Sequence, residues 1–595
     1  MSNYPEMAVA LPLRERRVLL ILTTMMSVAA AWSPSVWSAD QRGAHDIAIV
    51  LRPAAPDSKG VISSVTVTET LNVDSIAAGA AFLRMPQVLS NVQTVADSLS
   101  SLEVVNAGKT LKVTTRDDPA GSDPVYRRWV ADRPVKGPVI VSYTAPITNE
   151  PNRRGAAPPF ELRSEDGGFS AVSGAFLITP EGEARYDVQI RWDFSALPPG
   201  AMGVSTFGVG GASSRKALTT AELEAIYLMG GTIHSFPATY DKPGFFSAWQ
   251  GRLPFDGAVA MGWTKRLYDS YLTFFSAPLD KPYSVFLRRN LINAGGGVEV
   301  GDSFVATFDA TTQLQDLKLT LAHEMVHTFV GSLDAGHESL SLSWFSEGLA
   351  VYYERVLPYR AGLITADDFL RDLNTTAARY YTDALNNTLN SEIEKRFWAD
   401  TRVRVLPYDR GGLYLAALDE KVRRHSQGRR SLDDLVRSML DRRRSGKPMD
   451  EAAWVEIIST ELGPEGVADF NAMLAGTLVV PPSDSFGHCF VRTSAPLRRY
   501  DLGFTPDVLI EPARVVRGLE PGSAAARAGL QDGDSIVKPV PQDRIQSDQT
   551  ALLHLSIQRD GKPLEVSYLP RGETVEAYQW RRAGDCSAEN RGGPP

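Results

Sequence analysis

Apolar and polar residues alternate along the N-terminal third of the chain, which is the pattern of half-buried β-strands. The stretches VISSVTVTETL, LEVVNAGKTLKVTT, GPVIVSYTAPI and ARYDVQIRWDF show this alternation most clearly. Turn-forming residues separate them, for example Asn106-Ala107-Gly108. We therefore expect an N-terminal β-sandwich domain over residues 40–200.

Apolar residues recur every three or four positions from residue 312 to about 475, which predicts helices. The first predicted helix holds the stretch TTQLQDLKLTLAHEMVHTFVG. Thr312 and Gln315 suit a capping box at its start, and Gly331 suits its end. A glycine-rich stretch, residues 200–214, lacks the GxxxxGK[ST] and GxGxxG forms of phosphate-binding loops, so we expect an ordinary loop there.

The bulk composition narrows the class of protein. At 595 residues the chain is too long for one core, so we expect several domains. Its hydrophobic fraction of 43% and charged fraction of 22% are those of an ordinary soluble globular protein. A net charge of −8 gives no basic surface for nucleic acid, so no nucleic-acid partner is expected.

The N-terminus has the pattern of an export signal. Three arginines between residues 14 and 17 precede the short apolar run VLLILTTMMSVAAAW, and small residues follow it. We expect a signal peptide over residues 1–38 and a periplasmic or secreted protein; an uncleaved signal would instead anchor the chain to a membrane. The only two cysteines, Cys489 and Cys586, could form a disulfide in an oxidising compartment or be two unrelated thiols.

Two histidines in the first predicted helix suggest a metal site. His323 and His327 are four residues apart and project from one face, at a separation that suits two ligands of one Zn²⁺ ion. Glu324 lies beside the first histidine, where its carboxylate can reach an activated water without binding the metal. The alternative is an ordinary surface or core pair of histidines.

Glu347 is the stronger candidate for the third protein ligand that a catalytic zinc requires. It lies in the first turns of a second predicted helix, SWFSEGLAVYYERVLP, which Ser343 would cap and Pro358 would end. His337 is a weaker candidate, and the metzincin pattern fails because Thr-Phe-Val follows His327. Two histidines and a glutamate are the zinc ligands of thermolysin-like enzymes.

The chemistry expected from this set is hydrolysis. One Zn²⁺ ion activates water and polarises a scissile carbonyl, and Glu324 accepts the proton of the water as a general base. Tyr408, at the head of a later predicted helix in the stretch LPYDRGGLYLAALDEKV, can donate its phenolic O–H to the oxyanion.

These motifs together resemble the glycyl aminopeptidase family of gluzincin metallopeptidases, whose members carry a PDZ domain at the C-terminal end. The family's elements appear in order as GGGVE at 295–299, HEMVH at 323–327, WFSEG at 344–348 and YDRGG at 408–412. The resemblance implies that His323, His327 and Glu347 are the zinc ligands. It also implies that Glu324 is the general base and that Tyr408 stabilises the transition state.

The resemblance also implies a substrate-binding strand. Glu299 would pair with the free α-amino group of the substrate, beside Gly296 and Gly297, because an unpaired buried ammonium group costs several kcal/mol. The sequence departs from the family at Met325-Val326 and Thr328-Phe329, where aromatic residues are usual. We expect this departure to reshape the wall of the substrate pocket.

The last block resembles a PDZ domain through VVRGLEPGSAAARAGLQDGDSIVKP, residues 515–539. LGF at 502–504 would then form a loop that binds a peptide's C-terminal carboxylate through backbone N–H groups, with the peptide added as a strand. The alternative is a PDZ fold that packs on the catalytic domain without a ligand.

The expected fold class is multidomain α+β. The expected parts are a signal peptide (1–38), the N-terminal β-sandwich (40–200), a thermolysin-like catalytic domain (201–380), a helical domain (381–480), a PDZ domain (487–575) and a C-terminal tail (576–595). The expected function is an exported zinc aminopeptidase that hydrolyses peptides with a free N-terminus. Two alternatives stay open: an endopeptidase on the same zinc site, and a non-catalytic peptide-binding or scaffold protein led by the PDZ domain.

Overall fold

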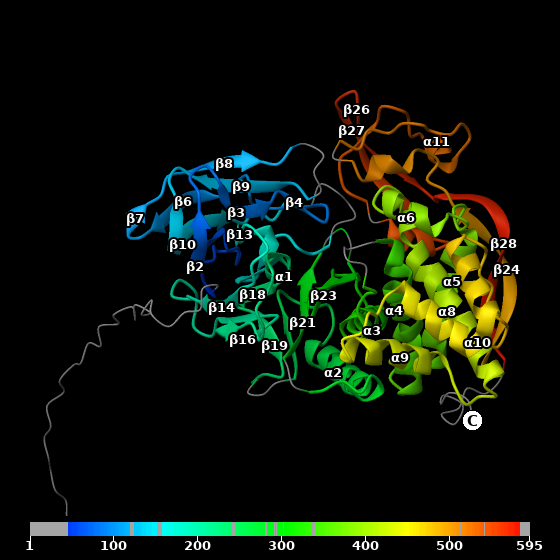
Figure 1. The fold of residues 1–595 in the computed structure, drawn as a ribbon. Coiled ribbons are helices and arrows are strands. Elements are labelled where there is room, and N and C mark those ends of the chain that lie inside the picture. Colours follow the sequence, from blue (N-terminus) through cyan, green and yellow to red (C-terminus); the bar gives the residue numbers. More distant parts are fainter. Residues whose placement is uncertain are drawn as a thin grey trace, which may run out of the picture. The chain divides into compact units, whose positions relative to one another are not determined.

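The structure, a computed structural model, describes residues 46–583 (Figure 1). It leaves out residues 120–123, 151–157, 241–243, 280–281, 291, 293, 302, 335–339, 512 and 541. The predicted signal peptide, His337 and Cys586 lie outside the described residues. None of the helices in the described part of the chain is long and apolar enough to cross a membrane.

Two sheets in the N-terminal region share one hydrophobic core. The alternation expected from the sequence is present in β2, where Val65, Val67 and Leu71 are buried and Thr66 is exposed. The first sheet consists, in spatial order, of β17 (Ala212–Ser213), β14 (Asp187–Trp192), β1 (Asp46–Pro53), β2 (Ser64–Ile76), β10 (Val135–Pro146), β6 (Ser100–Asn106) and β7 (Lys109–Thr110). The second consists of β13 (Thr179–Pro180), β3 (Ala81–Pro86), β9 (Tyr126–Ala131) and β8 (Val113–Asp117).

A third sheet contains part of the glycine-rich stretch, so the prediction of a loop over residues 200–214 is wrong. This sheet consists of β11 (Arg163–Glu165), β12 (Gly168–Val172), β18 (Tyr227–Gly231), β15 (Met202–Ser205) and β16 (Gly208–Val209). Gly203 in this sheet is needed for packing, because a Cβ at this position would lie 2.3 Å from the indole ring of Trp192. The Trp192 ring therefore lies flat on the backbone of β15, a contact that no side chain would permit.

A five-stranded mixed sheet leads into the helices (Figure 1). Its order is β19 (His234–Phe236), β20 (Phe245–Trp249), β21 (Tyr283–Arg289), β23 (Phe304–Phe308) and β22 (Gly297–Glu299). Helix α2 (Gly257–Phe274) connects the parallel strands β20 and β21. Strand β22 lies at one edge of the sheet, antiparallel to β23, and it contacts the first helix of the predicted metal site.

The helices between residues 312 and 475 pack around one large core. They are α3 (Leu314–Val330), α4 (Ser343–Arg360), α5 (Ala366–Thr382), α6 (Asn390–Arg396), α7 (Thr401–Arg404), α8 (Leu406–His425), α9 (Leu432–Arg444) and α10 (Glu451–Leu474). Helix α4 packs on α3 along one side and on α8 along another (Figure 1). The boundary predicted after residue 380 falls inside α5, because this helix continues its buried face to Thr382.

The ends of the helices differ in part from the prediction. Helix α3 stops at Gly331 as expected, with a φ of +65°. Its predicted capping box is absent, because the Thr312 hydroxyl is turned to Asp309, donating to its carboxylate and accepting its N–H. Ser343 is the first residue of α4 rather than its cap, and Pro358 lies inside the last turn of that helix instead of ending it.

The C-terminal block contains a long two-stranded ribbon and a small sheet. The ribbon is formed by β24 (Phe490–Tyr500) and β28 (Arg571–Arg582), and the sheet by β25 (Ser535–Ile536), β26 (Leu553–Arg559) and β27 (Lys562–Tyr568). Residues 576–582 therefore belong to a strand and not to the predicted tail, because Ala577 and Trp580 are buried where β28 lies along α5. Cys489, at the start of the ribbon, is disulfide-bonded.

Candidate metal centre

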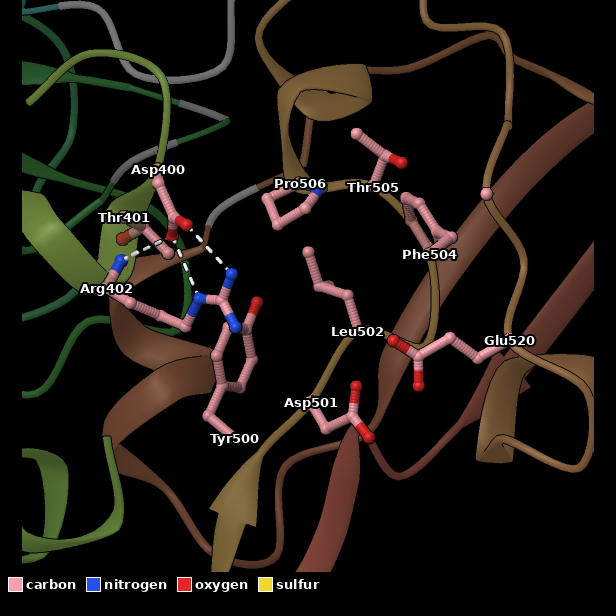
Figure 2. Close-up of a pocket in the computed structure, with 11 residues that line it drawn as sticks. Asp400, Thr401, Arg402, Tyr500, Asp501, Leu502, Phe504, Thr505, Pro506 and Glu520 are labelled. Atoms are coloured by element: carbon pink, nitrogen blue, oxygen red, sulfur yellow. Dashed lines mark hydrogen bonds and ion pairs between the residues drawn. The ribbon is translucent and has the colours of Figure 1, made fainter. Parts of the chain in front are cut away.

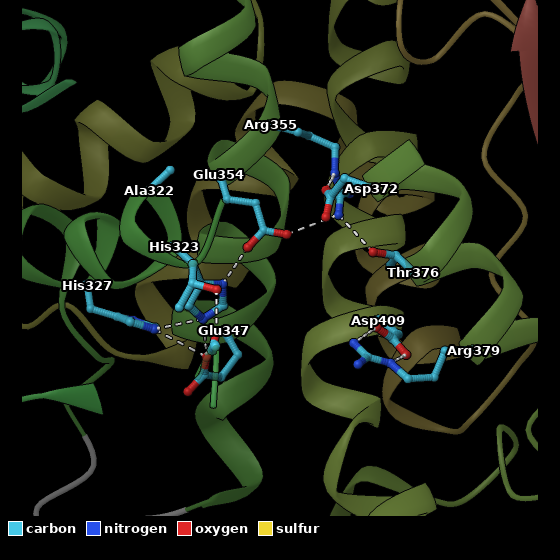
Figure 3. A network of polar contacts seen from close by, with 12 residues as sticks. Ala322, His323, His327, Glu347, Glu354, Arg355, Asp372, Thr376, Arg379 and Asp409 are labelled. Atoms are coloured by element: carbon cyan, nitrogen blue, oxygen red, sulfur yellow. Dashed lines mark hydrogen bonds and ion pairs between the residues drawn. The ribbon is translucent and has the colours of Figure 1, made fainter. Parts of the chain in front are cut away.

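Helices α3 and α4 bring three ligand atoms together. The Nε2 atoms of His323 and His327 each lie 3.2 Å from Oε2 of Glu347, and 3.3 Å from one another (Figure 3). A tetrahedral Zn²⁺ with bonds of about 2.0–2.1 Å separates its donor atoms by about 3.3–3.4 Å. The three donors thus have the spacing of three corners of a zinc tetrahedron, and an ion held there keeps a fourth position for water or substrate.

The spacing of the three donor atoms follows from the positions of the residues on α3 and α4. One turn of α3 separates His323 from His327, so both rings leave the same face of the helix. Helix α4 returns across that face and presents Glu347 from its second turn. The histidines are 9% and 8% exposed, so the ligands lie in a largely water-excluded site.

Glu354 is a further member of the site that the sequence analysis missed. Nδ1 of His323 lies 2.7 Å from Oε2 of Glu354, a carboxylate oxygen that accepts its hydrogen bond, so Nε2 is the ring nitrogen that faces the other ligands. Glu354 follows Glu347 by seven residues on α4, two helical turns along the same face. That spacing was the signal that the sequence offered.

The charges of these groups depend on one another. Burial lowers the pKa of His323, but hydrogen bonds to Glu347 and Glu354 outweigh burial and raise it well above its usual range. The pKa of His327 is also raised, because the charge of Glu347 outweighs burial. Burial raises the pKa of Glu347, but the charges and hydrogen bonds of the two histidines reverse the shift, so this carboxylate is ionised at neutral pH.

Glu324 faces the ligands without being one of them. Its side chain is 7% exposed, and it lies against the backbone of Gly297 on β22. Burial raises the pKa of Glu324 to about 7; the charges of the two histidines oppose this shift, and those of Glu347 and Glu299 add to it. A carboxylate with a pKa near the working pH can both take up and release a proton.

Tyr408 is brought beside the ligands by a close contact of α4 and α8. Its ring is stacked on that of His323, with 5.9 Å between ring centroids and 12° between planes. A Cβ on Gly348 would lie 2.7 Å from the backbone of Gly411, and one on Gly411 would lie 2.6 Å from the carbonyl oxygen of Trp344. The glycines of the WFSEG and YDRGG motifs are therefore needed so that the two helices touch and Tyr408 reaches the site.

The predicted substrate-binding strand is β22. Gly297 contacts Glu324, and the carbonyl oxygen of Gly296 accepts hydrogen bonds from the N–H and hydroxyl of Thr307 on β23. Glu299 is exposed at the end of the strand. Its charge contributes to the raised pKa of Glu324, so the two carboxylates lie within electrostatic range of each other.

Two of the four residues that depart from the family pattern lie in the core, and a reshaped pocket wall stays a prediction. Met325 and Val326 are completely buried in the core. Phe329 stacks on Phe275, with ring centroids 5.2 Å apart, and Thr328 contacts the hydroxyl of Tyr283. Met325 and Phe329 lie on the side of α3 away from the two histidines, whereas Val326 follows His323 by three residues and Thr328 follows Glu324 by four, so these two flank the face that carries the ligands.

The loop predicted to bind a peptide carboxylate borders a cavity of about 220 Å³ (Figure 2). The N–H of Gly503 already donates to Oδ1 of Asp501 over 2.8 Å. Arg402, on the far side of the cavity, is bound to both carboxylate oxygens of Asp400 (Figure 2). One of the backbone donors that a peptide carboxylate would use is therefore bonded within the protein.

The segment after this loop is not a free strand edge. Residues Pro506–Leu509 form a 3₁₀ helix, η4, so a peptide has no extended partner strand there. Helix α12 (Asp543–Ser547) of the C-terminal block packs on α5, and the hydroxyl of Thr401 donates to Oε1 of Gln546 over 3.3 Å. The C-terminal block therefore packs on the helices, and a peptide ligand for it stays a prediction.

Comparisons with known proteins agree with this site. A family model described as M61 glycyl aminopeptidase matches residues 317–399, which contain the ligands, Glu324 and Glu354. The resemblance read from the motifs is confirmed over this segment. No curated protein matches the chain.

A solved structure shares the fold. The chain is similar to an aminopeptidase N family protein from Idiomarina loihiensis, with a TM-score of 0.64 and 16% identity over 90% of this chain and 98% of that chain. It is also similar to an M1 zinc metallopeptidase from Deinococcus radiodurans, with a TM-score of 0.47 and 17% identity over 74% of this chain and 96% of that chain. The chain thus has a multidomain α+β fold like that of the Idiomarina protein, and its residues 317–399 resemble the M61 glycyl aminopeptidase family.

Proposed function

We propose that the protein is an exported zinc aminopeptidase that removes N-terminal residues from peptides. The observation that carries the proposal is the spacing of three donor atoms on His323, His327 and Glu347, at 3.2–3.3 Å from one another, beside the buried carboxylate of Glu324. Two imidazoles and a carboxylate are a donor set that suits Zn²⁺.

His323, His327 and Glu347 would hold one zinc ion. When bound, the ion would act as a Lewis acid that activates water and polarises the scissile carbonyl. Glu354 holds the Nδ1 proton of His323 and so fixes the tautomer that this ligand needs. The low exposure of the two histidines strengthens the charge interactions that they make within the site.

Glu324 acts as the general base in the proposed reaction. Its carboxylate takes the proton of the attacking water and delivers it to the nitrogen of the leaving amine. The raised pKa, about 7, supports this role, because a carboxylate at its ordinary pKa is a weak acceptor at neutral pH.

Tyr408 acts as a donor to the oxyanion that forms when water adds to the carbonyl. Its ring stacks on a ligand, and its phenolic O–H is a donor in a largely buried site. Such a donor is most useful where charge develops in the transition state, so its removal should slow turnover more than it weakens substrate binding.

Glu299 would select the first peptide bond by pairing with the free α-amino group. Its place on β22, two residues after the glycine that contacts Glu324, supports this role. Its exposure favours a second candidate function, an endopeptidase, because an exposed carboxylate discriminates weakly between charged and uncharged groups. Peptides are the substrates in either case.

Export is supported by the N-terminal sequence pattern and by the disulfide at Cys489, which an oxidising compartment favours. Membrane attachment would follow only from an uncleaved signal segment. N-terminal sequencing of the protein isolated from periplasm or medium tests this part, and a mature protein that still begins at Met1 would refute cleavage.

A PDZ-like fold for residues 487–575 is supported by the residues around Pro521-Gly522-Ser523 and Gly533-Asp534. Capture of peptide C-termini is the less favoured role for it, because the N–H of Gly503 is already bonded to Asp501. A titration of the protein with peptides bearing free or amidated C-termini tests this role, and tight binding that needs the free carboxylate would support it.

The deciding experiment is a panel of dipeptide amides, each offered with a free and with an acetylated N-terminus, to zinc-loaded protein. We expect hydrolysis of the free amines only, abolished by a chelator and weakened in Glu299→Gln. Equal hydrolysis of both series would identify an endopeptidase. Hydrolysis of neither series by protein that holds zinc would favour the non-catalytic scaffold.

A further inference from the structure

Helix α5 carries a stripe of polar side chains behind the metal centre. Asp372, Thr376 and Arg379 follow one another by four and three residues, so they lie on one face of the helix. The first two bind Arg355 of α4, and Arg379 binds both carboxylate oxygens of Asp409 on α8 (Figure 3).

Arg355 is a buried arginine that is bound by three different side chains. It is 1% exposed. Its Nε–H donates to Asp372, and its Nη2 donates to Thr376 over 2.8 Å and to Oε1 of Glu354 over 3.2 Å. The other oxygen of Glu354 accepts the Nδ1–H of His323 (Figure 3). Hydrogen bonds thus connect α5, through two side chains of α4, to a metal ligand.

We propose that Arg355 is a positioning residue of the metal centre, which holds Glu354 in the orientation that directs His323 toward the metal. This inference rests on the proposed zinc function. Both oxygens of Glu354 are used, one by Arg355 and one by His323, so the carboxylate cannot rotate without losing a hydrogen bond. The orientation of the imidazole is then set by the guanidinium behind it.

The shape of the arginine side chain is well suited to this role. A guanidinium is planar and presents its donors as a rigid fork, so contacts to Asp372 and Thr376 fix the direction in which the remaining donor points. A lysine has the charge but only one nitrogen, and it cannot make the three contacts in one plane.

The charge of Arg355 has a second effect. The guanidinium lies between two carboxylates, those of Glu354 and Asp372. Without it, two buried carboxylates would face each other with no cation between them, and their repulsion would push Glu354 out of its place. The ring of His323 would then lose its fixed orientation, although the ligand itself would still be present.

A purely structural role of Arg355 is the competing explanation, and α5 provides a matched control. Asn374 lies two residues after Asp372, about 200° around the helix, and faces the ribbon instead of the metal centre. Its amide donates to the carbonyl oxygen of Trp580 over 2.8 Å and accepts the N–H of that residue over 2.7 Å. Asn374→Ala therefore removes two hydrogen bonds of α5 without touching Arg355.

The test compares metal binding in full-length variants, measured by competition with a chromophoric chelator for Zn²⁺ and by the visible absorption bands of Co²⁺ in the site. In Arg355→Gln we expect about tenfold weaker zinc binding, the usual size for a lost outer partner of a ligand, and shifted cobalt bands. Arg355→Lys should recover part of the loss, because it restores the charge but not the fork. Asn374→Ala should lower thermal stability and leave both metal measurements at their wild-type values.

Wild-type zinc affinity and cobalt bands in Arg355→Gln would overturn the inference, as would equal changes in Asn374→Ala. Should Arg355→Gln not fold, Asp372→Asn replaces it, because it keeps the size of the side chain at a less buried position. We expect a loss of roughly threefold there, and an unchanged affinity would overturn the inference. A wild-type protein that binds neither ion would overturn the proposed function itself, and the inference with it.

Discussion

The backbone of Gly297 lies directly against the side chain of Glu324. A Cβ at position 297 would be 2.4 Å from Cγ and 2.7 Å from Oε1 of Glu324, closer than any two such atoms can approach. Because position 297 has no side chain, the strand leaves the space that Glu324, the proposed general base, occupies. Strand β22 thus has two roles: its backbone at Gly297 makes room for Glu324, and it carries Glu299.

Gly297→Ala should therefore impair catalysis without removing the metal ligands. The added methyl group must displace the Glu324 carboxylate, and a misplacement of about 1 Å can cost on the order of 100-fold in rate. We expect kcat to fall by about that factor while zinc content stays at one ion per chain. Gly262→Ala on α2 is the control, because its Cβ would have only one neighbour, at 3.9 Å; a full rate in Gly297→Ala would contradict the assigned contact.

The three residues that the structure brings together could be proposed from the sequence, because the spacing within each of the two helices places them. Residues four apart face the same way on any helix, so His323 and His327 follow from the sequence, and the second helix with Glu347 follows from its own apolar period. Glu354 could also have been predicted from helical spacing, since it lies two turns beyond Glu347 on the same helix.

Other features depended on contacts between segments far apart in the chain. Gly203 sits in a strand because Trp192 packs on it, which no local pattern of residues 200–214 reveals. Arg355 is buried because α5 supplies Asp372, and its sequence alone suggests an exposed helix position. Thr312 bonds to Asp309 instead of capping α3, because a nearby turn competes for the same hydroxyl.

Glu324→Gln should separate catalysis from metal binding. The amide has the size of the carboxylate but cannot accept the proton of water, and a general base contributes about 10²–10⁴-fold to the rate. We expect kcat to fall by that range with zinc content unchanged, measured by peptide hydrolysis and metal analysis on the same sample. Glu347→Gln is the paired variant, and it should lose zinc instead; unaltered turnover in Glu324→Gln would refute its role as base.

The pH dependence of kcat/KM should report the same group. Burial raises the pKa of Glu324 to about 7, and the base must be ionised to act, so activity should rise with pH on the acid side. A bound divalent cation favours the ionised carboxylate, which puts the midpoint of the acid limb below 7 and above the ordinary value of 4.5. An acid limb that keeps its midpoint in Glu324→Gln would assign it to another group.

Tyr408→Phe should reduce kcat and leave KM nearly unchanged. The loss of one donor to an oxyanion typically costs about 10²–10³-fold, and the ring that stacks on His323 is preserved. Tyr414→Phe on the same helix is the matched control, because that ring packs between Trp344 and Phe470 in the core. If both variants slowed turnover equally, the effect would belong to the packing of α8 and not to the phenol of Tyr408.

The N-terminal β domain should lose stability as the pH rises, because of one buried acid. Glu69 on β2 is 2% exposed, and its carboxyl group accepts a hydrogen bond of 2.7 Å from the hydroxyl of Tyr143. Burial raises the pKa of Glu69 from 4.5 to about 8, which outweighs the opposite effect of that hydrogen bond. A carboxyl group with a raised folded-state pKa stabilises the fold fully below pH 4.5, and this contribution is lost as the pH rises through about 8.

Between those values the loss should approach about 1.4 kcal/mol per pH unit from this group alone. Glu69→Gln cannot ionise, so the difference in unfolding free energy between variant and wild type should grow in favour of the variant from pH 5 to pH 8. Urea unfolding followed by tryptophan fluorescence at several pH values measures the difference. Glu103→Gln on the exposed face of β6 should show no such trend, and parallel pH profiles of Glu69→Gln and wild type would mean that Glu69 keeps its ordinary pKa in the folded protein.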